Sequence, residues 1–153
     1  MGQCFQNTMK RKEAVQVKLK QLLEGISYEV QPGAAELEIS EIQYGSRKVE
    51  KDSLFVCITG FQTDGHKYIP MAVEKGAAAL LCEHKVENVP ENVTVIVTEN
   101  NRIALAVASS NFYGHPSREM HAIGVTGTNG KTSTTYLMKS ILDRVGSKVG
   151  IVG

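Results

Sequence analysis

One short segment restricts the possible fold of this chain more than any other: an apolar run, a glycine-rich turn and a Lys-Thr pair in direct succession. Ala122 to Thr126 has the character of a strand, and Gly127-Thr128-Asn129-Gly130-Lys131-Thr132-Ser133 follows it. Apolar residues then recur at helical spacing, at Leu137, Met138, Ile141, Leu142 and Val145, and Gly146 ends the pattern. The segment therefore predicts a βα unit whose helix begins at the glycine-rich loop.

This arrangement of strand, loop and helix predicts a phosphate-binding site. Backbone N–H groups and the positive end of a helix dipole converge on anion oxygens at such a loop. Gly127 and Gly130 allow positive φ angles and a close backbone approach that a Cβ would block. We expect Lys131 to bring a full charge to the β- and γ-phosphates of a nucleoside triphosphate, and the Thr132 hydroxyl to bind Mg²⁺.

The loop departs from the common GxxxxGK[ST] pattern by one residue. Val125 stands where that pattern has its first glycine, and Gly124 lies one position earlier. A glycine-rich turn with only a structural role is the alternative interpretation. That alternative does not explain the Lys-Thr pair or the run of four hydroxyl residues at Thr132, Ser133, Thr134 and Thr135. Phosphate binding by Gly127 to Ser133 is therefore the better interpretation.

The rest of the chain alternates between strand and helix patterns. Short apolar runs predict strands at Leu54 to Ile58, Ala77 to Cys82, Val93 to Val97 and Lys148 to Val152. Helical spacing predicts helices at Val17 to Ile26, Tyr68 to Lys75 and Arg102 to Tyr113. This order is typical of an α/β fold with at least partly parallel strands. We expect an N-terminal extension at residues 1–16, a small α/β domain at 17–113, a linker at 114–120, and the truncated start of a Rossmann-like domain at 121–153.

Charge and cysteine content narrow the range of partners. A formal net charge of +1 with interspersed signs argues against a general surface for nucleic acid or anionic membrane, and no stretch approaches the roughly 20 apolar residues of a membrane span. The three cysteines, Cys4, Cys57 and Cys82, lack a CxxC spacing, and two of them lie in apolar runs. A reduced, cytoplasmic setting is expected.

Three of the four histidines are expected to lie in solvent-facing loops without a metal or catalytic role. The sequence neighbours of His66 do not form a ligand set, so we expect it to be a solvent-facing loop residue, and we expect the same of His84 and His121. His115 lies in the Gly114-His115-Pro116-Ser117 segment that breaks the helical periodicity. We expect His115 to act in the hinge and its packing, and a contact with the nucleotide is the alternative.

The loop sequence Gly124-Val125-Thr126-Gly127-Thr128-Asn129-Gly130-Lys131-Thr132 resembles the variant phosphate loop of the Mur ligase family. The resemblance implies that ATP and Mg²⁺ are the cofactors and that Lys131 is catalytic. It also implies a mechanism in which ATP converts a carboxylate of a UDP-linked muramoyl peptide into an acyl phosphate, which an amine then attacks. A carboxylate is a poor electrophile and phosphate a good leaving group, so positioning and charge neutralisation carry the first step.

A second resemblance lies in the first domain. The segments Tyr44-Gly45-Ser46-Arg47-Lys48-Val49 and Gly60-Phe61-Gln62-Thr63-Asp64-Gly65-His66 are similar to those of Mur ligase domains that bind the UDP precursor. The resemblance implies that the precursor contacts Tyr44, Ser46, Phe61, Gln62 and Thr63. A solvated turn and an ordinary loop are the respective alternatives. The family pattern has Asp where this chain has Gly45, and often a polar residue where it has Phe61.

The linker favours one branch of the family. Tyr113-Gly114-His115-Pro116-Ser117 resembles the linker of the ligases that add the third residue, meso-diaminopimelate or L-lysine, to UDP-N-acetylmuramoyl-L-alanyl-D-glutamate. The resemblance implies a monomeric enzyme of cell-wall synthesis, with no nucleic-acid or membrane partner. Three alternatives remain open: the sibling ligase that adds D-Ala-D-Ala, a nucleotide-binding module without catalysis, and an unrelated P-loop kinase or ATPase.

Overall fold

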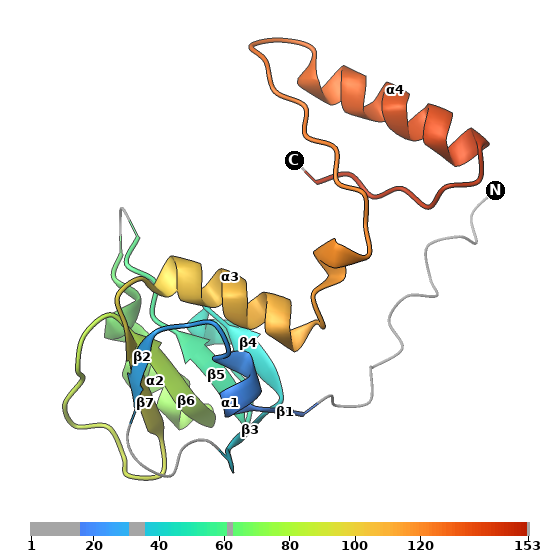
Figure 1. Cartoon of the computed structure of the whole chain (residues 1–153). Helices are drawn as coiled ribbons and strands as arrows, with labels where there is room; N and C mark the ends of the chain where they lie inside the picture. Colours follow the sequence, from blue (N-terminus) through green and yellow to red (C-terminus); the bar gives the residue numbers. More distant parts are fainter. Residues whose placement is uncertain (1–15, 31–35, 61–62, 153) are drawn as a thin grey trace. The chain divides into compact units, whose positions relative to one another are not determined.

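The computed structural model describes residues 16–30, 36–60 and 63–152. The chain divides into two compact units, Met1–Pro116 and Ser117–Gly153 (Figure 1). Each unit has its own secondary structure, and each is described by itself below. Among the described helices, none has both the length and the apolar character needed to cross a bilayer.

The first unit is built on a five-stranded sheet with the order β2-β7-β6-β5-β4. Its strands are β2 (Tyr28–Val30), β4 (Glu41–Gln43), β5 (Ser53–Val56), β6 (Ala77–Cys82) and β7 (Thr94–Thr98). Strands β4, β5, β6 and β7 run parallel to one another, and β2 pairs antiparallel with β7 at the edge. The carboxyl ends of the parallel strands β4, β5, β6 and β7 therefore lie along the same end of the sheet, which we call the carboxyl edge.

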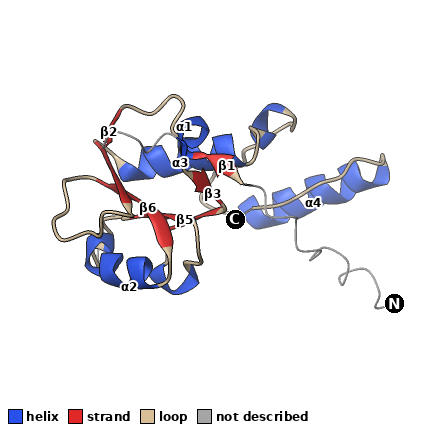
Figure 2. Cartoon of the chain, turned by 90° about the horizontal axis from the view of Figure 1, so that it is seen from below, coloured by secondary structure: helices blue, strands red, loops and turns tan. Residues whose placement is uncertain are grey.

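Helices cover both faces of this sheet. Helices α1 (Leu19–Leu22) and α3 (Asn101–Phe112) lie on one face, and α2 (Ile69–Glu74) lies on the other (Figure 2). Successive residues of a strand point to opposite faces, so Leu54 and Val56 pack with α1 and α3 while Phe55 packs with α2. Burial on both faces explains why these strands are continuous apolar runs in the sequence.

Most of the expected elements of the first unit are confirmed, but the first helix is much shorter than expected. The apolar run from Val17 to Ile26 contains a helix of only four residues. Val17 and Lys18 instead form β1, which pairs antiparallel with β3 (Glu38–Ile39). Pairing of this backbone with a distant segment overrides the local helical pattern.

The second unit consists of a short 3₁₀ turn, η4 (Pro116–Arg118), an extended segment and the helix α4 (Lys131–Arg144). Gly146 has a positive φ of 84° just after α4, and the Ser147 N–H donates to the Leu142 carbonyl at 3.0 Å. This geometry ends the helix where the sequence predicts. Within the described part of this unit, no residue is buried.

The strands expected at Ala122 to Thr126 and Lys148 to Val152 are absent, so this prediction was wrong. A strand needs a hydrogen-bonded neighbour, and neither segment has one among the described residues. The Val149 carbonyl instead accepts a hydrogen bond of 2.9 Å from Lys139 Nζ on α4.

Candidate functional site

The glycine-rich loop leads directly into the first turn of α4. Gly130 is the residue before the helix, and its φ of 75° and ψ of −2° lie in the left-handed region that suits glycine. The first intrahelical hydrogen bond runs from Thr134 N–H to the Gly130 carbonyl at 2.9 Å. The N–H groups of Lys131, Thr132 and Ser133 therefore have no hydrogen-bond acceptor within the helix. With no acidic residue in this first turn, the helix N-terminus has the geometry and the charge of an anion site.

The Lys131 side chain turns back over the loop that precedes it. Its Nζ donates to the Gly127 carbonyl at 2.5 Å and lies 3.4 Å from the Thr128 carbonyl. The ammonium group is thus held beside the free N–H groups of the first turn. A phosphate oxygen would offer it a charge-assisted hydrogen bond, which is stronger than its bonds to neutral carbonyls.

The predicted nucleotide-binding residues all lie on one exposed stretch, in the order Gly127, Thr128, Asn129, Gly130, Lys131, Thr132 and Ser133. Thr132 lies in the first turn of α4, where a hydroxyl oxygen is the kind of hard ligand that Mg²⁺ prefers. The neighbouring Thr135 hydroxyl is used within the helix, since it donates to the Thr132 carbonyl at 2.8 Å. The arrangement is therefore suitable for a triphosphate and its cation.

A second group of predicted residues lies at the carboxyl edge of the sheet in the first unit. Tyr44 follows β4 and is 70% exposed, and Ser46 opens the 3₁₀ turn η2 (Ser46–Lys48). Thr63 is exposed in the loop after β5. Since β4 and β5 are parallel neighbours, these residues emerge at the same edge. Phe61 and Gln62 lie outside the described residues.

The loop after β5 returns tightly to the strand that it leaves. Thr59 and Asp64 form an isolated antiparallel bridge, and Gly65 N–H donates to the Ile58 carbonyl at 2.9 Å. A Cβ on Gly65 would lie 2.6 Å from the Ile58 nitrogen, closer than any side chain allows. Gly65 therefore permits the close approach that anchors both ends of the loop carrying Thr63.

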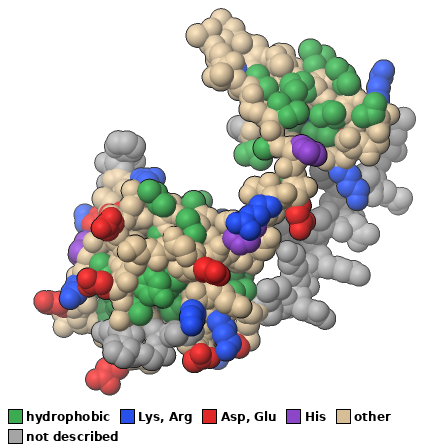
Figure 3. All heavy atoms as spheres, in the orientation of Figure 1, with side chains coloured by type: hydrophobic (Ala, Val, Ile, Leu, Met, Phe, Trp, Pro, Cys, Tyr) green, Lys and Arg blue, Asp and Glu red, His purple; other side chains and the backbone are tan. Residues whose placement is uncertain are grey.

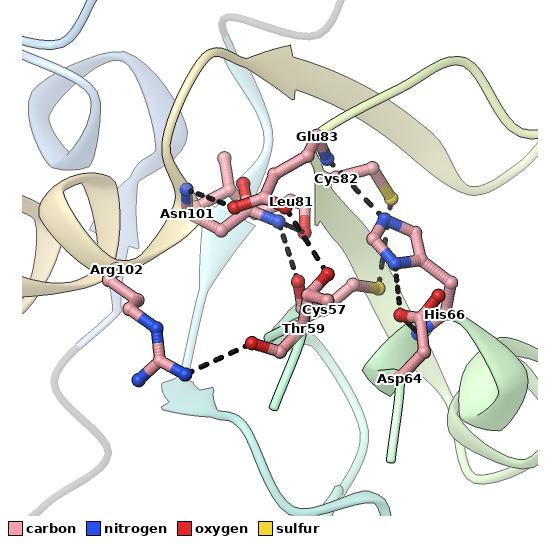
Figure 4. A network of polar contacts seen from close by, with 9 residues as sticks. All are labelled: Cys57, Thr59, Asp64, His66, Leu81, Cys82, Glu83, Asn101 and Arg102. Carbon is pink, nitrogen blue, oxygen red and sulfur yellow. Dashed lines mark hydrogen bonds and ion pairs between the residues drawn. The ribbon is translucent and has the colours of Figure 1, made fainter. Parts of the chain in front are cut away.

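A buried asparagine, which the sequence analysis did not identify, connects three strand ends at this edge (Figure 4). Asn101 is fully buried, and its Nδ2 donates to the Cys57 carbonyl at 2.7 Å and to the Leu81 carbonyl at 3.0 Å. Its Oδ1 accepts from the Thr98 hydroxyl at 2.8 Å. One side chain thus satisfies polar groups that follow β5, end β6 and end β7.

Charged side chains extend this network towards the loop after β5. Glu83 accepts from the Asn101 N–H and from the Thr59 hydroxyl, each at 3.2 Å. Arg102 Nη2 donates to the Thr59 carbonyl at 3.0 Å. Each of these polar residues follows an apolar strand closely in the sequence, but that position alone does not distinguish a buried polar residue from an exposed one. The network supports the base of the loop that carries Thr63.

His66 does not face solvent, so the expectation for this residue was wrong. Its side chain is only 9% exposed, and Nδ1 lies 2.6 Å from Asp64 Oδ1. Asp64 also accepts from the His66 N–H at 3.0 Å and thereby caps the 3₁₀ turn η3 (Gly65–Tyr68), which turns the imidazole inwards. The hydrogen bonds from His66 lower the pKa of Asp64. On the other side of the ring, His84 stacks at 4.2 Å and is itself exposed, as expected.

Two cysteines lie next to His66 in the core. Cys57 and Cys82 are fully buried and are free thiols, and their sulfur atoms are 3.7 Å apart. The hydrogen bond between the thiols and their burial raise the pKa of Cys57. Both sulfurs and one ring nitrogen of His66 lie within 4.8 Å of one another. The sequence neighbours of His66 do not form a ligand set, as expected, but Cys57 and Cys82 lie beside it in the structure.

Charged side chains of both signs lie on the face of the molecule that Figure 3 shows. In Figure 3, basic and acidic side chains are interspersed over the face that is shown, and they do not gather into a single basic surface. The candidate sites are therefore local features of particular loops and strand ends.

Comparisons with known sequences match both units. Residues 38–113 match the family model described as "Mur ligase family, catalytic domain", and residues 125–153 match "Mur ligase middle domain". The UDP-N-acetylmuramoyl-L-alanyl-D-glutamate--2,6-diaminopimelate ligase of Clostridium tetani is 46% identical over 139 residues, which is 90% of this chain and 29% of that protein. The ligase of the same name from Clostridium botulinum is 49% identical over 118 residues, 76% of this chain and 24% of that protein.

Solved structures share the fold. A crystal structure of MurF from Acinetobacter baumannii has a TM-score of 0.70 at 22% identity, covering 86% of this chain and 28% of that one. The MurF ligase from Thermotoga maritima, in complex with ADP, has a TM-score of 0.52 at 27% identity, covering 68% of this chain and 23% of that one. The α/β architecture expected from the sequence is confirmed.

The two family models match separate parts of the chain, in the order in which the two units occur. The two relatives extend the likeness across 76% to 90% of the chain, and this chain spans 24% to 29% of their length. The chain belongs to the Mur ligase family.

Proposed function

We propose that this chain is the nucleotide-binding front part of an ATP-dependent ligase that adds the third amino acid to UDP-N-acetylmuramoyl-L-alanyl-D-glutamate. The observation that carries the proposal is the exposed start of α4 with Lys131 beside it. It occurs in a chain 46% identical to a relative named as the corresponding diaminopimelate ligase. Because the chain spans 29% of that relative, the activity, substrates and partners are proposed for the whole protein.

The proposed reaction has two steps. A carboxylate oxygen of the precursor attacks the γ-phosphorus of ATP, which releases ADP and forms an acyl phosphate. An amine then attacks the acyl carbon, and inorganic phosphate leaves as the amide forms. Lys131 serves the first step, because its ammonium neutralises charge on the phosphoryl oxygens during transfer.

The backbone of Gly127 to Ser133 would hold the phosphates through the free N–H groups at the start of α4. The Thr132 hydroxyl is proposed as a Mg²⁺ ligand, and Mg²⁺ when bound would neutralise the β- and γ-phosphates. The structure fits this role because Thr132 offers an oxygen on the exposed first turn. The MurF ligase from Thermotoga maritima, which shares the fold, was solved in complex with ADP, and this supports the use of an adenine nucleotide by the whole protein.

The precursor is proposed to bind the carboxyl edge of the sheet in the first unit. Tyr44 has an exposed ring that can stack on the uracil, and the Ser46 hydroxyl suits a diphosphate oxygen. Thr63, together with Phe61 and Gln62, completes the proposed contact set. The parallel pairing of β4 and β5 supports the grouping, since it places the segments after both strands at one edge.

We propose diaminopimelate as the added amino acid, in place of lysine, because the relatives from Clostridium tetani and Clostridium botulinum carry it in their names. A monomer acting in the cytoplasm, where ATP and the UDP precursor are available, is the proposed setting. The sibling reaction with D-Ala-D-Ala is less well supported, since the MurF structures are 22% to 27% identical to this chain.

The whole protein provides the decisive test. Phosphate release is measured with ATP, the UDP-muramoyl dipeptide and diaminopimelate, and then with lysine or D-Ala-D-Ala in place of diaminopimelate. The proposal expects turnover with diaminopimelate alone and its loss in Lys131→Ala. Lys148→Ala, an exposed lysine of the same unit, is the matched control and should retain turnover. Equal turnover with D-Ala-D-Ala would move the protein to the sibling reaction.

Residues 1–153 by themselves are proposed to bind nucleotide without forming an amide. A fluorescent ATP analogue should bind this chain, and Lys131→Ala should weaken binding about 10- to 100-fold, the value of a charged hydrogen bond. Amide formation by residues 1–153 alone would contradict this part of the proposal.

Calorimetry with UDP tests the first unit separately. Ser46→Ala should weaken UDP binding about 10- to 100-fold, the value of one hydrogen bond to a charged group. Ser117→Ala, an exposed serine of the second unit, is the matched control. Undiminished affinity in Ser46→Ala would remove this serine from the site.

A further inference from the structure

Two thiols and an imidazole meet in the first unit, although they come from three separate elements. Cys57 follows β5, Cys82 ends β6, and His66 lies in η3. Both sulfur atoms and one ring nitrogen lie within 4.8 Å of one another. We propose that these three side chains bind a single thiophilic metal ion of the Zn²⁺ class.

The spacing of the two sulfurs already matches that of metal ligands. The Sγ atoms of Cys57 and Cys82 are 3.7 Å apart (Figure 4). Two sulfurs that bind one tetrahedral Zn²⁺ at about 2.3 Å are separated by about 3.8 Å. Neither thiol needs to move apart from the other to accept the ion. A hydrogen bond between the thiols would give a similar distance, so the experiment below must distinguish the two.

The orientation of His66 is that of a metal-binding histidine. Its Nδ1 lies 2.6 Å from Asp64 Oδ1, and a carboxylate on one ring nitrogen directs the other nitrogen towards a metal. That other nitrogen, Nε2, accepts a hydrogen bond from the Glu83 N–H at 3.4 Å. A bond of this length is weak, and metal coordination can replace it.

The chemistry of the site selects a soft cation. Each thiol releases its proton to water as its sulfur bonds to the ion, so two thiolates neutralise a divalent charge without any redox change. Thiolate and imidazole ligands favour Zn²⁺ and its neighbours over Mg²⁺ and Ca²⁺, which prefer oxygen. The three side chains complete a tetrahedral ion if a water molecule takes the fourth position. Both thiols belong to the buried cluster that also includes Phe55, Leu80 and Val93.

The ion would connect the end of β5, the turn η3 and the end of β6. These elements lie at the base of the loop between Thr59 and Asp64. The antiparallel bridge between these two residues closes the loop. Metal binding would therefore stiffen this loop and stabilise the first unit. The inference stands apart from the proposed ligase activity, because its test measures metal binding directly.

The test uses the whole chain, reduced and freed of metal with a chelator. Co²⁺ is titrated first, because a cobalt–thiolate bond produces a charge-transfer absorption in the near ultraviolet, and Zn²⁺ is then added to displace it. The proposal expects one ion per chain, a thiolate band that Zn²⁺ removes, and no response to Mg²⁺. A folded chain that shows no cobalt–thiolate band would overturn it and leave the hydrogen-bonded thiol pair.

Substitutions assign the ligands. Cys57→Ala, Cys82→Ala and His66→Gln should each weaken Co²⁺ binding by more than about a hundredfold, while Asp64→Asn should weaken it about tenfold and keep the thiolate band. Cys4→Ala and His121→Gln replace a cysteine and a histidine outside the cluster and should leave binding unchanged. Binding that survives in either cysteine variant, or that depends on Cys4, would overturn the assignment.

Circular dichroism confirms that each variant is folded. A second measurement on the unsubstituted chain covers the case in which a cysteine variant does not fold. Under mild urea, Zn²⁺ should protect both Cys57 and Cys82 from alkylation, as mapped by mass spectrometry. Equal alkylation of these residues with and without Zn²⁺ would contradict the proposal.

Discussion

The candidate sites of the two units are formed by different kinds of interaction. In the second unit, the loop and the helix start are contained in consecutive residues, and none of the described residues of that unit is buried. In the first unit, the carboxyl edge is assembled from strand ends far apart in sequence, and Asn101 alone bonds to groups 20 and 44 residues away. The glycine-rich loop thus depends on local backbone geometry, whereas the sheet edge depends on packing.

The state of α4 illustrates the same contrast. Its apolar residues Leu137 and Ile141 are 66% and 64% exposed, and Val145 just beyond it is 73% exposed. A helix of this length is marginal without packing, so the described contacts that support it are local ones. Substitutions in this unit should therefore have small, local effects, and substitutions at the sheet edge should have large, cooperative ones.

The largest effect is expected for Asn101→Ala. The change leaves the Cys57 and Leu81 carbonyls buried without their donor, and each orphaned acceptor costs about 1–3 kcal/mol. The free energy of unfolding in urea should fall by about 2 kcal/mol or more. Asn129→Ala, an exposed asparagine of the phosphate loop, is the control and should change it by less than about 0.5 kcal/mol. Similar losses in the two variants would break the contrast.

Gly65→Ala should destabilise the first unit by about 1–3 kcal/mol, the usual cost of overpacking. The new Cβ would meet the Ile58 backbone at 2.6 Å and would force the loop after β5 away from the strand. Gly45→Ala is the matched glycine, since no heavy atom lies within 4 Å of its Cβ position. Urea unfolding of both variants measures the difference, and equal stability would show that the loop base tolerates displacement.

Gly130→Ala should have a smaller effect, confined to the start of α4. A residue other than glycine in the left-handed region costs about 1–2 kcal/mol, and Gly130 has a φ of 75°. Amide hydrogen exchange of Thr134, whose N–H donates to the Gly130 carbonyl, should accelerate about 5- to 30-fold, as that cost implies. Gly124→Ala, where φ is not positive and the Cβ position is open, should leave exchange unchanged. Loss of protection throughout the first unit would show that the units are coupled.

The smallest effect is expected for Asp143→Asn. This change removes the ion pair with Lys139, whose closest N–O distance is 2.9 Å. Exposed pairs one helical turn apart contribute about 0.3–0.5 kcal/mol, so amide exchange in the last turn of α4 should accelerate about twofold at low salt. High salt should abolish the difference, because it screens exposed charges. An effect that persists in high salt would mean that Asp143 acts by some route other than charge.

Part of the fold and the site could be predicted because the controlling interactions are local. The strands β5, β6 and β7 were found as apolar runs, and α4 was found by its spacing and its terminal glycine. The helix expected at Val17 to Ile26 was predicted too long, because Val17 and Lys18 form a strand that pairs with β3. The strands expected on either side of α4 were wrong because a strand exists only where another segment pairs with it.

The candidate site divides in the same way. The residues from Gly127 to Ser133 were identified from their residue types between a strand pattern and a helix pattern. The roles predicted for them and for Tyr44, Ser46, Phe61, Gln62 and Thr63 stay predictions. Asn101 was missed because an asparagine after a strand has the same pattern whether it faces solvent or three buried carbonyl and hydroxyl groups. His66 was wrongly predicted to face solvent, because its sequence neighbours do not include the two thiols beside which it lies in the structure.

The sequence by itself determined the glycine-rich loop before α4, most of the alternation of strands and helices in the first unit, and the likeness to the Mur ligase family, because these depend on residues close together in the sequence. Only the tertiary structure decided that His66 turns inwards beside Cys57 and Cys82 and that Asn101 joins three strand ends. His66 lies 9 and 16 positions from the two cysteines, and Asn101 bonds to carbonyl groups 20 and 44 positions away. These contacts exist only once the parallel strands have brought their carboxyl ends to one edge.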